Sequence, residues 1–220
     1  MFVKICGIRD VDTALAVVLA GADAIGLNFY EKSPRVVAPA MAAEIVVRIH
    51  GFAGTPVEAV GVFVNHSADE IRKICRQCKL RTVQLHGDEP PELVADLTAE
   101  YRVIRAFRVG NEGLSSPAQY LDACRRLSAT PWACLVDARV TGQYGGTGQT
   151  APWEVIAREY NAVDWPPLIL AGGLGPHNVA QAIRMIGPWG VDVAGGVESS
   201  VACKDATLVR QFVQNAKGML

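Results

Sequence analysis

Short apolar segments alternate with longer amphipathic segments along the whole chain. The apolar segments are rich in β-branched residues and mostly run without polar interruptions, which is typical of strands buried on both faces. We expect strands at residues 2–6, 24–29, 59–64, 82–86, 103–107, 133–137, 168–171 and 190–194. The segments between them have apolar residues at helical spacing and predict helices at residues 11–19, 38–49, 68–78, 91–98, 117–127, 152–160, 177–186 and 204–217.

Several of these helices begin with residues that favour a helix N-terminus, such as Ser67 ahead of Asp69 and Glu70, and the prolines Pro91 and Pro117. Eight strand–helix units in 220 residues predict an α/β fold, a single (β/α)₈ barrel of the TIM type, as one domain over residues 1–220. A doubly wound open sheet is the alternative. It is disfavoured because eight is a closing number of strands and no G-x-G-x-x-G motif follows a strand.

Charge gives no sign of a nucleic-acid partner or an acidic membrane surface. Lys and Arg number 21 against 22 Asp and Glu, and the charges are not gathered into blocks. No apolar run approaches the about 20 residues that a membrane-spanning helix needs. We therefore expect neither nucleic acid nor membrane among the partners.

The cysteines indicate a reducing compartment, because they are scattered and most stand among apolar residues. The six are Cys6, Cys75, Cys78, Cys124, Cys134 and Cys203. The N-terminal apolar stretch is too short for a signal peptide, so we expect a cytoplasmic protein. The Cys75-x-x-Cys78 pair could be a redox motif or half a metal site, but it lies late in a predicted helix without a second pair, which favours a structural role.

Two reactive side chains stand where this fold places catalytic residues, at the C-terminal ends of the strands. Cys6 ends the first strand; it could be an inert buried cysteine, a nucleophile or a base. Asp137 ends the sixth strand, and an acid in that place is costly unless it is solvated, paired or used. The long glycine-rich segment 138–148 that follows is typical of a functional lid or of a disordered connector, and only a lid would explain the acid at its start.

Other polar residues near the strand ends are candidates for substrate binding. Arg35, in the turn Ser33-Pro34-Arg35, could be a solvated surface residue or could bind a carboxylate or phosphate through two donors. Gln84 and His86 share one face of the fourth strand, where His86 is either a structural residue or a ligand contact. Asp192 lies on the eighth strand. Asn28, polar within an apolar strand, would need a hydrogen-bond partner if buried.

Glycine pairs end the seventh and eighth strands, at Gly172-Gly173 and Gly195-Gly196. In (β/α)₈ barrels the loops after these two strands frequently bind phosphate. Glycine allows backbone N–H groups to approach the anion, and a following helix N-terminus adds positive potential. Each pair is a weak signal alone, and the two together predict a phosphate site.

In order along the chain, these residues resemble the phosphoribosylanthranilate isomerase family of tryptophan biosynthesis. The resemblance spans nearly the whole sequence, and it rests on the combination of motifs rather than on one of them. The matching segments are residues 4–8, 21–26, 33–35, 60–65, 84–87, 145–148, 170–174 and 191–193, with Asp137 and Asn178.

The resemblance implies an Amadori rearrangement of N-(5-phosphoribosyl)anthranilate to 1-(2-carboxyphenylamino)-1-deoxyribulose 5-phosphate. In that reaction Asp137 would be the general acid that opens the ribose ring, and Cys6, as thiolate, the base that removes the C2′ proton. Arg35 would bind the anthranilate carboxylate. The rearrangement involves no net redox change, so neither a cofactor nor a metal is expected.

The remaining site residues follow from the same resemblance. Gln84, His86 and Asp192 are expected to contact the substrate. The phosphate would bind at the two glycine pairs named above, with the segment 145–148 closing over it, so that Gly145 and Gly146 are further phosphate-binding candidates.

Two segments depart from the family pattern. The family usually has Ser-Ser-Gly-Val-Glu after the eighth strand, where this chain has Ala194-Gly195-Gly196-Val197-Glu198, so backbone groups must replace two hydroxyl donors. Further on, residues 201–205 read Val-Ala-Cys-Lys-Asp in place of the usual Pro-Gly-x-Lys-Asp, which leaves the shape of the last loop open.

Two other functions stay open at this point. A related phosphate-binding barrel, such as a sugar-phosphate epimerase or indole-glycerol-phosphate synthase, would use metal-binding His and Asp residues or a Lys and Glu pair. Only His86 of the four histidines ends a predicted strand. A non-catalytic sensor of a phosphorylated metabolite would not need both Cys6 and Asp137. The sequence is compatible with a monomer or a homodimer.

Overall fold

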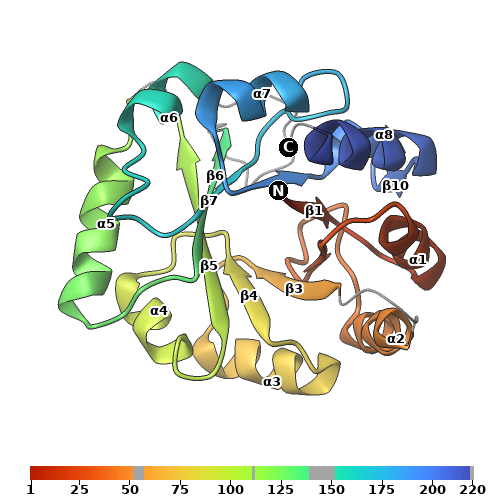
Figure 1. Cartoon of the computed structure of the whole chain (residues 1–220). Coiled ribbons are helices and arrows are strands. Elements are labelled where there is room, and N and C mark those ends of the chain that lie inside the picture. Colours follow the sequence, from red (N-terminus) through yellow and green to blue (C-terminus); the bar gives the residue numbers. More distant parts are fainter. Residues whose placement is uncertain (52–56, 111, 139–151, 219–220) are drawn as a thin grey trace.

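Eight parallel strands form a closed barrel in chain order, and the first strand pairs with the last (Figure 1). The structure is a computed structural model, and it describes residues 1–51, 57–110, 112–138 and 152–218. Because β1 pairs with both β2 and β8, the sheet has no open edge, and the predicted (β/α)₈ barrel is confirmed. The strands are β1 (Phe2–Cys6), β2 (Ala24–Asn28), β3 (Glu58–Phe63), β4 (Thr82–Leu85), β5 (Arg102–Val109), β6 (Ala133–Ala138), β7 (Leu168–Leu170) and β8 (Gly190–Val193).

The helices lie in a ring outside the barrel, each following its strand (Figure 1). They are α1 (Val11–Leu19), α2 (Pro39–His50), α3 (Ala68–Cys78), α4 (Pro91–Leu97), α5 (Ser115–Arg126), α6 (Trp153–Glu159), α7 (Val179–Ile186) and α8 (Ala206–Lys217). The helix start expected at Ser67 is confirmed, and it forms a capping box: Glu70 Oε2 accepts from Ser67 N at 2.8 Å, and Ser67 Oγ accepts from Glu70 N at 3.3 Å. Within the described ranges, no helix is both long enough and apolar enough to cross a membrane.

The chain after β8 differs from the expectation. One turn of 3₁₀ helix (Gly195–Val197) is followed by a short antiparallel hairpin of β9 (Glu198–Ser200) and β10 (Cys203–Lys204). Helix α8 then begins at Ala206 rather than at Lys204, because the Asp205 side chain caps it by accepting from the backbone N–H groups of its first turn. The hairpin sets the shape of the last loop, which the sequence had left open.

The apolar core has two parts. The larger one lies between the sheet and the helices, and a smaller cluster fills the barrel with residues such as Val60, Ile104, Leu135 and Ile169. Alternation along each strand sends neighbouring residues to opposite sides of the sheet.

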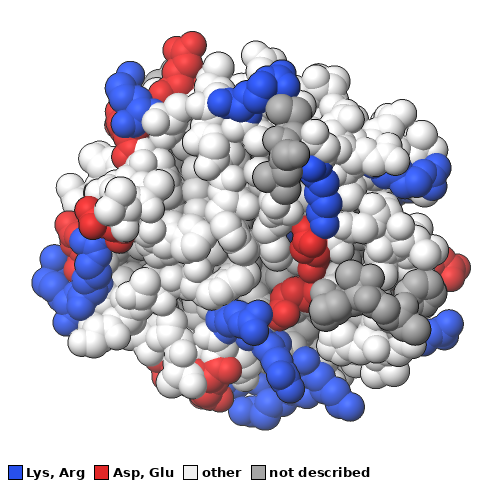
Figure 2. Space-filling model, in the orientation of Figure 1, with Lys and Arg blue, Asp and Glu red and all other residues white. Residues whose placement is uncertain are grey.

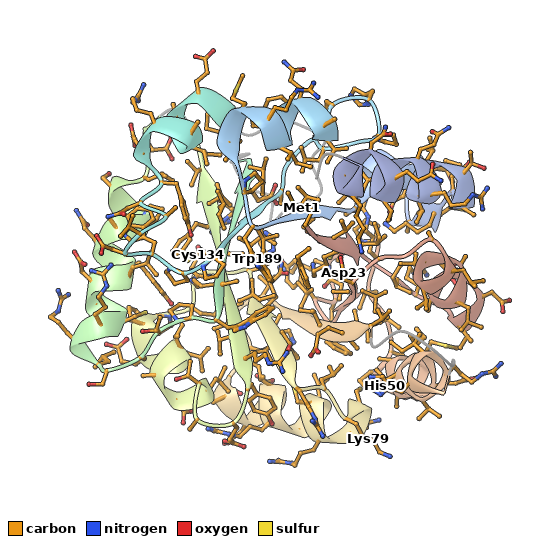
Figure 3. All side chains as sticks on the ribbon, in the orientation of Figure 1. Met1, Asp23, His50, Lys79, Cys134 and Trp189 are labelled. Atoms are coloured by element: carbon orange, nitrogen blue, oxygen red, sulfur yellow. The ribbon has the colours of Figure 1, made fainter. Side chains whose placement is uncertain are left out.

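The N-terminal end of the barrel is closed by aromatic rings. Phe2 stacks on Trp189 with ring centroids 4.6 Å apart, and Trp132 packs edge-on against both. Figure 3 shows Trp189 and Met1 near the centre of the ring of helices. Because Cys6 lies at the opposite end of β1, a small molecule would reach it from the C-terminal end of the barrel.

Charged side chains of both signs are interspersed on the surface. On the face drawn in Figure 2, Lys and Arg lie beside Asp and Glu around the edge and also just right of the centre, while the area left of the centre is uncharged. This distribution agrees with the formal net charge of −1 and with the absence of charge blocks in the sequence.

Candidate active site

Cys6 ends β1 and is buried with 9% of its surface exposed, at the inner wall of the barrel. Its neighbour in register on β2 is Gly26. A Cβ atom built on Gly26 would lie 2.6 Å from Cys6 Sγ and 3.0 Å from Cys6 Cα. The absence of a side chain on β2 therefore leaves the space that the thiol occupies.

Lys4 lies two residues before Cys6 on β1, so alternation places the two side chains on the same face of the strand. Lys4 is fully buried, and its Nζ donates to Asp192 Oδ1 at 2.7 Å. Asp192 is the β8 residue in register with Lys4. Sequence reasoning predicted Asp192 as a substrate contact but did not include Lys4 in the site, although period-two alternation from Cys6 points to it.

Two opposing influences act on the Cys6 thiol. Burial raises the pKa of Cys6 above its ordinary value of 9.0, and the positive charges of Lys4 and Lys204 act in the opposite direction. The negative charge of Asp192 adds to the increase. The net direction is upward, so in the free protein the thiol holds its proton more firmly than an exposed cysteine does.

Arg35 is held by the turn that follows β2. Ser33 Oγ accepts from Asn28 Nδ2 and from the Arg35 backbone N, both at 3.1 Å, so the polar residue within β2 has the partner it was expected to need. The Arg35 guanidinium binds Glu198 through two hydrogen bonds of 2.7 Å, Nε to Oε1 and Nη2 to Oε2. This bidentate geometry fixes the plane of the guanidinium.

Glu198 also binds a second cation. Lys204 Nζ donates to Glu198 Oε1 at 2.6 Å and to the Ala194 carbonyl at 2.9 Å, and the two side chains are 3% and 4% exposed. Burial alone would raise the pKa of Glu198, but the hydrogen bonds from Arg35 and Lys204 outweigh it and lower the pKa to about 2. Two cations share one carboxylate here, so the cluster has a formal charge of +1. Sequence reasoning did not identify Glu198 or Lys204 as site residues.

Gln84, His86 and Asp137 lie together at the ends of β4 and β6, across the barrel from β1. Gln84 Nε2 lies 2.8 Å from His86 Nδ1, and His86 Nε2 lies 3.5 Å from Asp137 Oδ2. All three residues are buried. Gln84 Nε2 and His86 Nδ1 are within hydrogen-bonding distance, and His86 Nε2 is directed toward the Asp137 carboxylate. Gly145 and Gly146, expected to close over the phosphate, lie outside the described residues.

The loop after β7 has the left-handed backbone that only glycine adopts freely. Gly172 and Gly173 have φ of +86° and +63°. The Asn178 side chain bridges this loop, since its Oδ1 accepts from Gly175 N at 2.8 Å and its Nδ2 donates to the Gly173 carbonyl at 2.9 Å. The loop is thus held in one shape before a ligand binds.

The loop after β8 packs directly on the loop after β7. A Cβ atom on Gly196 would lie 1.8 Å from the Leu174 carbonyl oxygen, so only glycine fits there. A Cβ atom on Gly195 would lie 3.4 Å from Arg35 Nη2. The structure therefore brings the two predicted glycine pairs together and places Arg35 beside them; phosphate binding by them stays a prediction.

A thiol and a carboxyl lie at the C-terminal end of a closed (β/α)₈ barrel, beside paired glycine loops. This is where enzymes of the (β/α)₈-barrel class have their active sites. Residues 3–215 match the family model described as N-(5′-phosphoribosyl)anthranilate (PRA) isomerase. The chain belongs to this family, and the resemblance predicted from the sequence motifs is confirmed.

Individual relatives match over nearly their full lengths. The N-(5′-phosphoribosyl)anthranilate isomerase of Geobacter sulfurreducens is 45% identical over 216 residues, covering 98% of each chain. A crystal structure of monomers generated from the dimeric phosphoribosylanthranilate isomerase of Thermotoga maritima superposes with a TM-score of 0.82, at 35% identity and 99% coverage of both chains. A phosphoribosylanthranilate isomerase in complex with reduced 1-(o-carboxyphenylamino)-1-deoxyribulose 5-phosphate gives the same TM-score, identity and coverage.

Proposed function

We propose that this member of the isomerase family rearranges N-(5-phosphoribosyl)anthranilate in tryptophan biosynthesis with Asp137 as general acid and Cys6 as general base. The observation that supports these roles is the placement of the two groups. Both are buried at the C-terminal end of the barrel interior, on strands β6 and β1, which are separated in the sheet only by β7 and β8. A sugar bound over that end would have one group on each side.

The first step opens the ribose ring. Asp137 donates a proton to the ring oxygen as the C1′–O bond breaks, and the anthranilate nitrogen supplies its electron pair to form a protonated Schiff base. The carboxylate that remains faces His86 Nε2, 3.5 Å away, and the N–H there stabilises its charge. A positioned acid of this kind contributes roughly 10²–10⁴ in rate.

The second step moves the proton at C2′. The Cys6 thiolate removes it, and the electrons of the C–H bond form a C1′=C2′ double bond while those of the C=N bond return to nitrogen. The enol then tautomerises to the ketone of the product. No electrons enter or leave overall, so the step needs only a base of suitable pKa in the right place.

Substrate binding is assigned to the groups around this pair. Arg35 uses two of its five N–H donors on Glu198, which leaves others for the anthranilate carboxylate. The glycine loops after β7 and β8 would bind the phosphate through backbone N–H groups, which accounts for the missing hydroxyls at positions 194 and 195. Gln84, His86 and Asp192 are the remaining proposed contacts.

The proposed setting is the cytoplasm, and the proposed assembly is a monomer or a homodimer. Five of the six free cysteines are buried, which supports a reducing compartment. The relative described as dimeric, at 35% identity, supports the homodimer. Sedimentation equilibrium of the purified chain distinguishes the two assemblies.

Complementation tests the proposed roles. The wild-type chain should restore growth of a tryptophan auxotroph that lacks this isomerase, and Cys6→Ala and Asp137→Asn should not. Cys203→Ala, which removes the exposed cysteine of β10, is the matched control and should restore growth. Both inactive variants should keep the wild-type circular dichroism spectrum and bind the reduced product analogue. Growth of either at the wild-type rate would overturn the assignment of that residue.

A further inference from the structure

Lys4 is a fully buried lysine that takes no part in the two proton transfers proposed for Asp137 and Cys6. Such a residue is rare, because removing an ammonium from water costs several kcal/mol unless it is paired. Its Nζ lies 2.7 Å from Asp192 Oδ1, and it points into the same part of the barrel as Cys6. Its place between a carboxylate and the thiol gives it a second possible partner.

We propose that Lys4 is a positioning residue that stabilises the thiolate form of Cys6, and that Asp192 sets how strongly it does so. The inference rests on the proposed role of Cys6 as the base. The inference goes beyond that role, because it names the residue that allows a buried thiol to act as a base.

The backbone fixes the three side chains relative to one another. Lys4 and Cys6 are at positions i and i+2 of the same strand, and Asp192 is in register with Lys4 on the adjacent strand. An ammonium has three donors, so one can bind Asp192 while another is directed to the sulfur. Burial lowers the pKa of Lys4, but the negative charges of Asp192 and Cys6 outweigh it and the pKa is raised. Burial raises the pKa of Cys6, and the positive charge of Lys4 acts against that increase.

Charged groups face Cys6 from several elements. Lys4 comes from β1, Asp192 from β8, Lys204 from β10 and Arg35 from the turn after β2. Lys204 and Arg35 are both bound to the same carboxylate, which weakens their fields at the sulfur. Among these groups, Lys4 opposes the effect of burial on the thiol most strongly.

The arrangement suits a base that changes charge during the reaction. Before proton abstraction, the thiolate and Asp192 flank the ammonium on two sides. When Cys6 takes the C2′ proton it becomes neutral, and Lys4 stays paired with Asp192 as a neutral unit. The buried lysine therefore has a counter-ion in both states.

The test measures the ionisation of Cys6 in the free protein. Alkylation by iodoacetamide is followed against pH in Lys4→Met and Asp192→Asn, both in a Cys203→Ser background that removes the exposed thiol, and the Cys6 peptide is quantified by mass spectrometry. Lys4→Met should move the midpoint of the pH–rate curve upward by about one to three pKa units, so that alkylation at pH 8 slows at least about tenfold. Asp192→Asn should move the midpoint downward.

Opposite signs separate this role from a structural one. If the ion pair only held the barrel together, both substitutions would loosen the site and change alkylation in the same direction. Shifts of the same sign, or no shift, would overturn the proposal. Should Lys4→Met fail to fold, the double variant Lys4→Met/Asp192→Asn removes both charges. Its midpoint should still lie above that of the background, and an unchanged midpoint would count against the proposal.

The result is independent of the base assignment itself. Turnover by Cys6→Ala tests whether the thiol is needed, and alkylation tests whether Lys4 controls it. If Cys6→Ala loses turnover but Lys4→Met leaves the alkylation midpoint unchanged, only the inference about Lys4 is wrong. If Cys6→Ala keeps full turnover, Cys6 is not the base, but the measured effect of Lys4 on the thiol still stands.

Discussion

Replacing Glu198 by Gln should destabilise the protein in a way that depends on pH. The carboxylate is buried between Arg35 and Lys204 and also accepts from the Ala202 backbone N–H at 3.2 Å. Glutamine keeps the size of the side chain but removes its charge. Its amide nitrogen, itself a donor, would lie against the donors of Arg35 or Lys204. The change therefore leaves two buried cations without their counter-ion.

The size of the effect follows from the pKa of Glu198, which hydrogen bonds from the two cations lower from an ordinary 4.5 to about 2 against the opposing effect of burial. At about 1.36 kcal/mol per pKa unit, ionisation of this carboxyl stabilises the folded state by about 3 kcal/mol at neutral pH. Because the folded pKa lies below the unfolded one, this contribution is complete above about pH 5 and shrinks as the pH falls. Near pH 2.5 it should be about 1 kcal/mol.

Urea unfolding of the wild type and Glu198→Gln at a series of pH values measures the difference directly. The two free energies of unfolding should differ by about 3 kcal/mol at pH 7 and converge as the pH falls towards 2.5. Asp122→Asn, which breaks an exposed pair with Arg125, is the control and should change stability by less than about 1 kcal/mol. A Glu198→Gln deficit that is absent at pH 7, or that is the same at pH 7 and pH 2.5, would refute the reasoning.

Three further substitutions test single features of the site. Ala202→Gly should raise the free energy of unfolding by about 1 kcal/mol, since Ala202 has φ of +63° where the family usually has glycine. Gly26→Ala should lower kcat/KM about 10²-fold in steady-state assays, because the added Cβ displaces the Cys6 thiol. Asn178→Ala should raise KM about tenfold with little change in kcat, because the Gly173 loop loses its bridging hydrogen bonds.

Each of these has a matched control or a clear contrary result. Gly51→Ala adds a methyl group at the end of α2, away from the site, and should keep full activity; a similar loss there would show that Gly26→Ala acts through the fold. Asn161→Ala removes side-chain contacts in the loop before β7 and should leave KM unchanged. A less stable Ala202→Gly would mean that the backbone there is not strained.

Local pattern predicted most of the barrel, because most strands are short, apolar and buried. β5 extends beyond its predicted range at both ends, where it carries Arg102 and Arg108. The strand ending at Cys6 and the helix ending at Cys78 were predicted to the residue. The hairpin of β9 and β10 was not predicted, since its strands are two and three residues long and partly exposed. Segments this short contain too few apolar residues to show the two-residue alternation of a strand.

The reactive pair and the glycine loops could be predicted because this fold assigns function to the ends of strands. The ion pairs of the site could not be predicted from the sequence. Lys4 binds Asp192 across 188 positions and Arg35 binds Glu198 across 163, so neither partner is visible in local sequence. The direction of the Cys6 pKa also depends on burial and on the charges of Lys4, Asp192 and Lys204, brought together from three parts of the chain.

The most direct test of the central claim is the turnover of N-(5-phosphoribosyl)anthranilate by purified Cys6→Ala relative to Cys203→Ala. Both substitutions remove one sulfur, but only Cys6 lies at the inner wall of the barrel. The account predicts that kcat falls roughly 10²–10⁴-fold in Cys6→Ala and is unchanged in Cys203→Ala. Equal turnover in the two variants would contradict it.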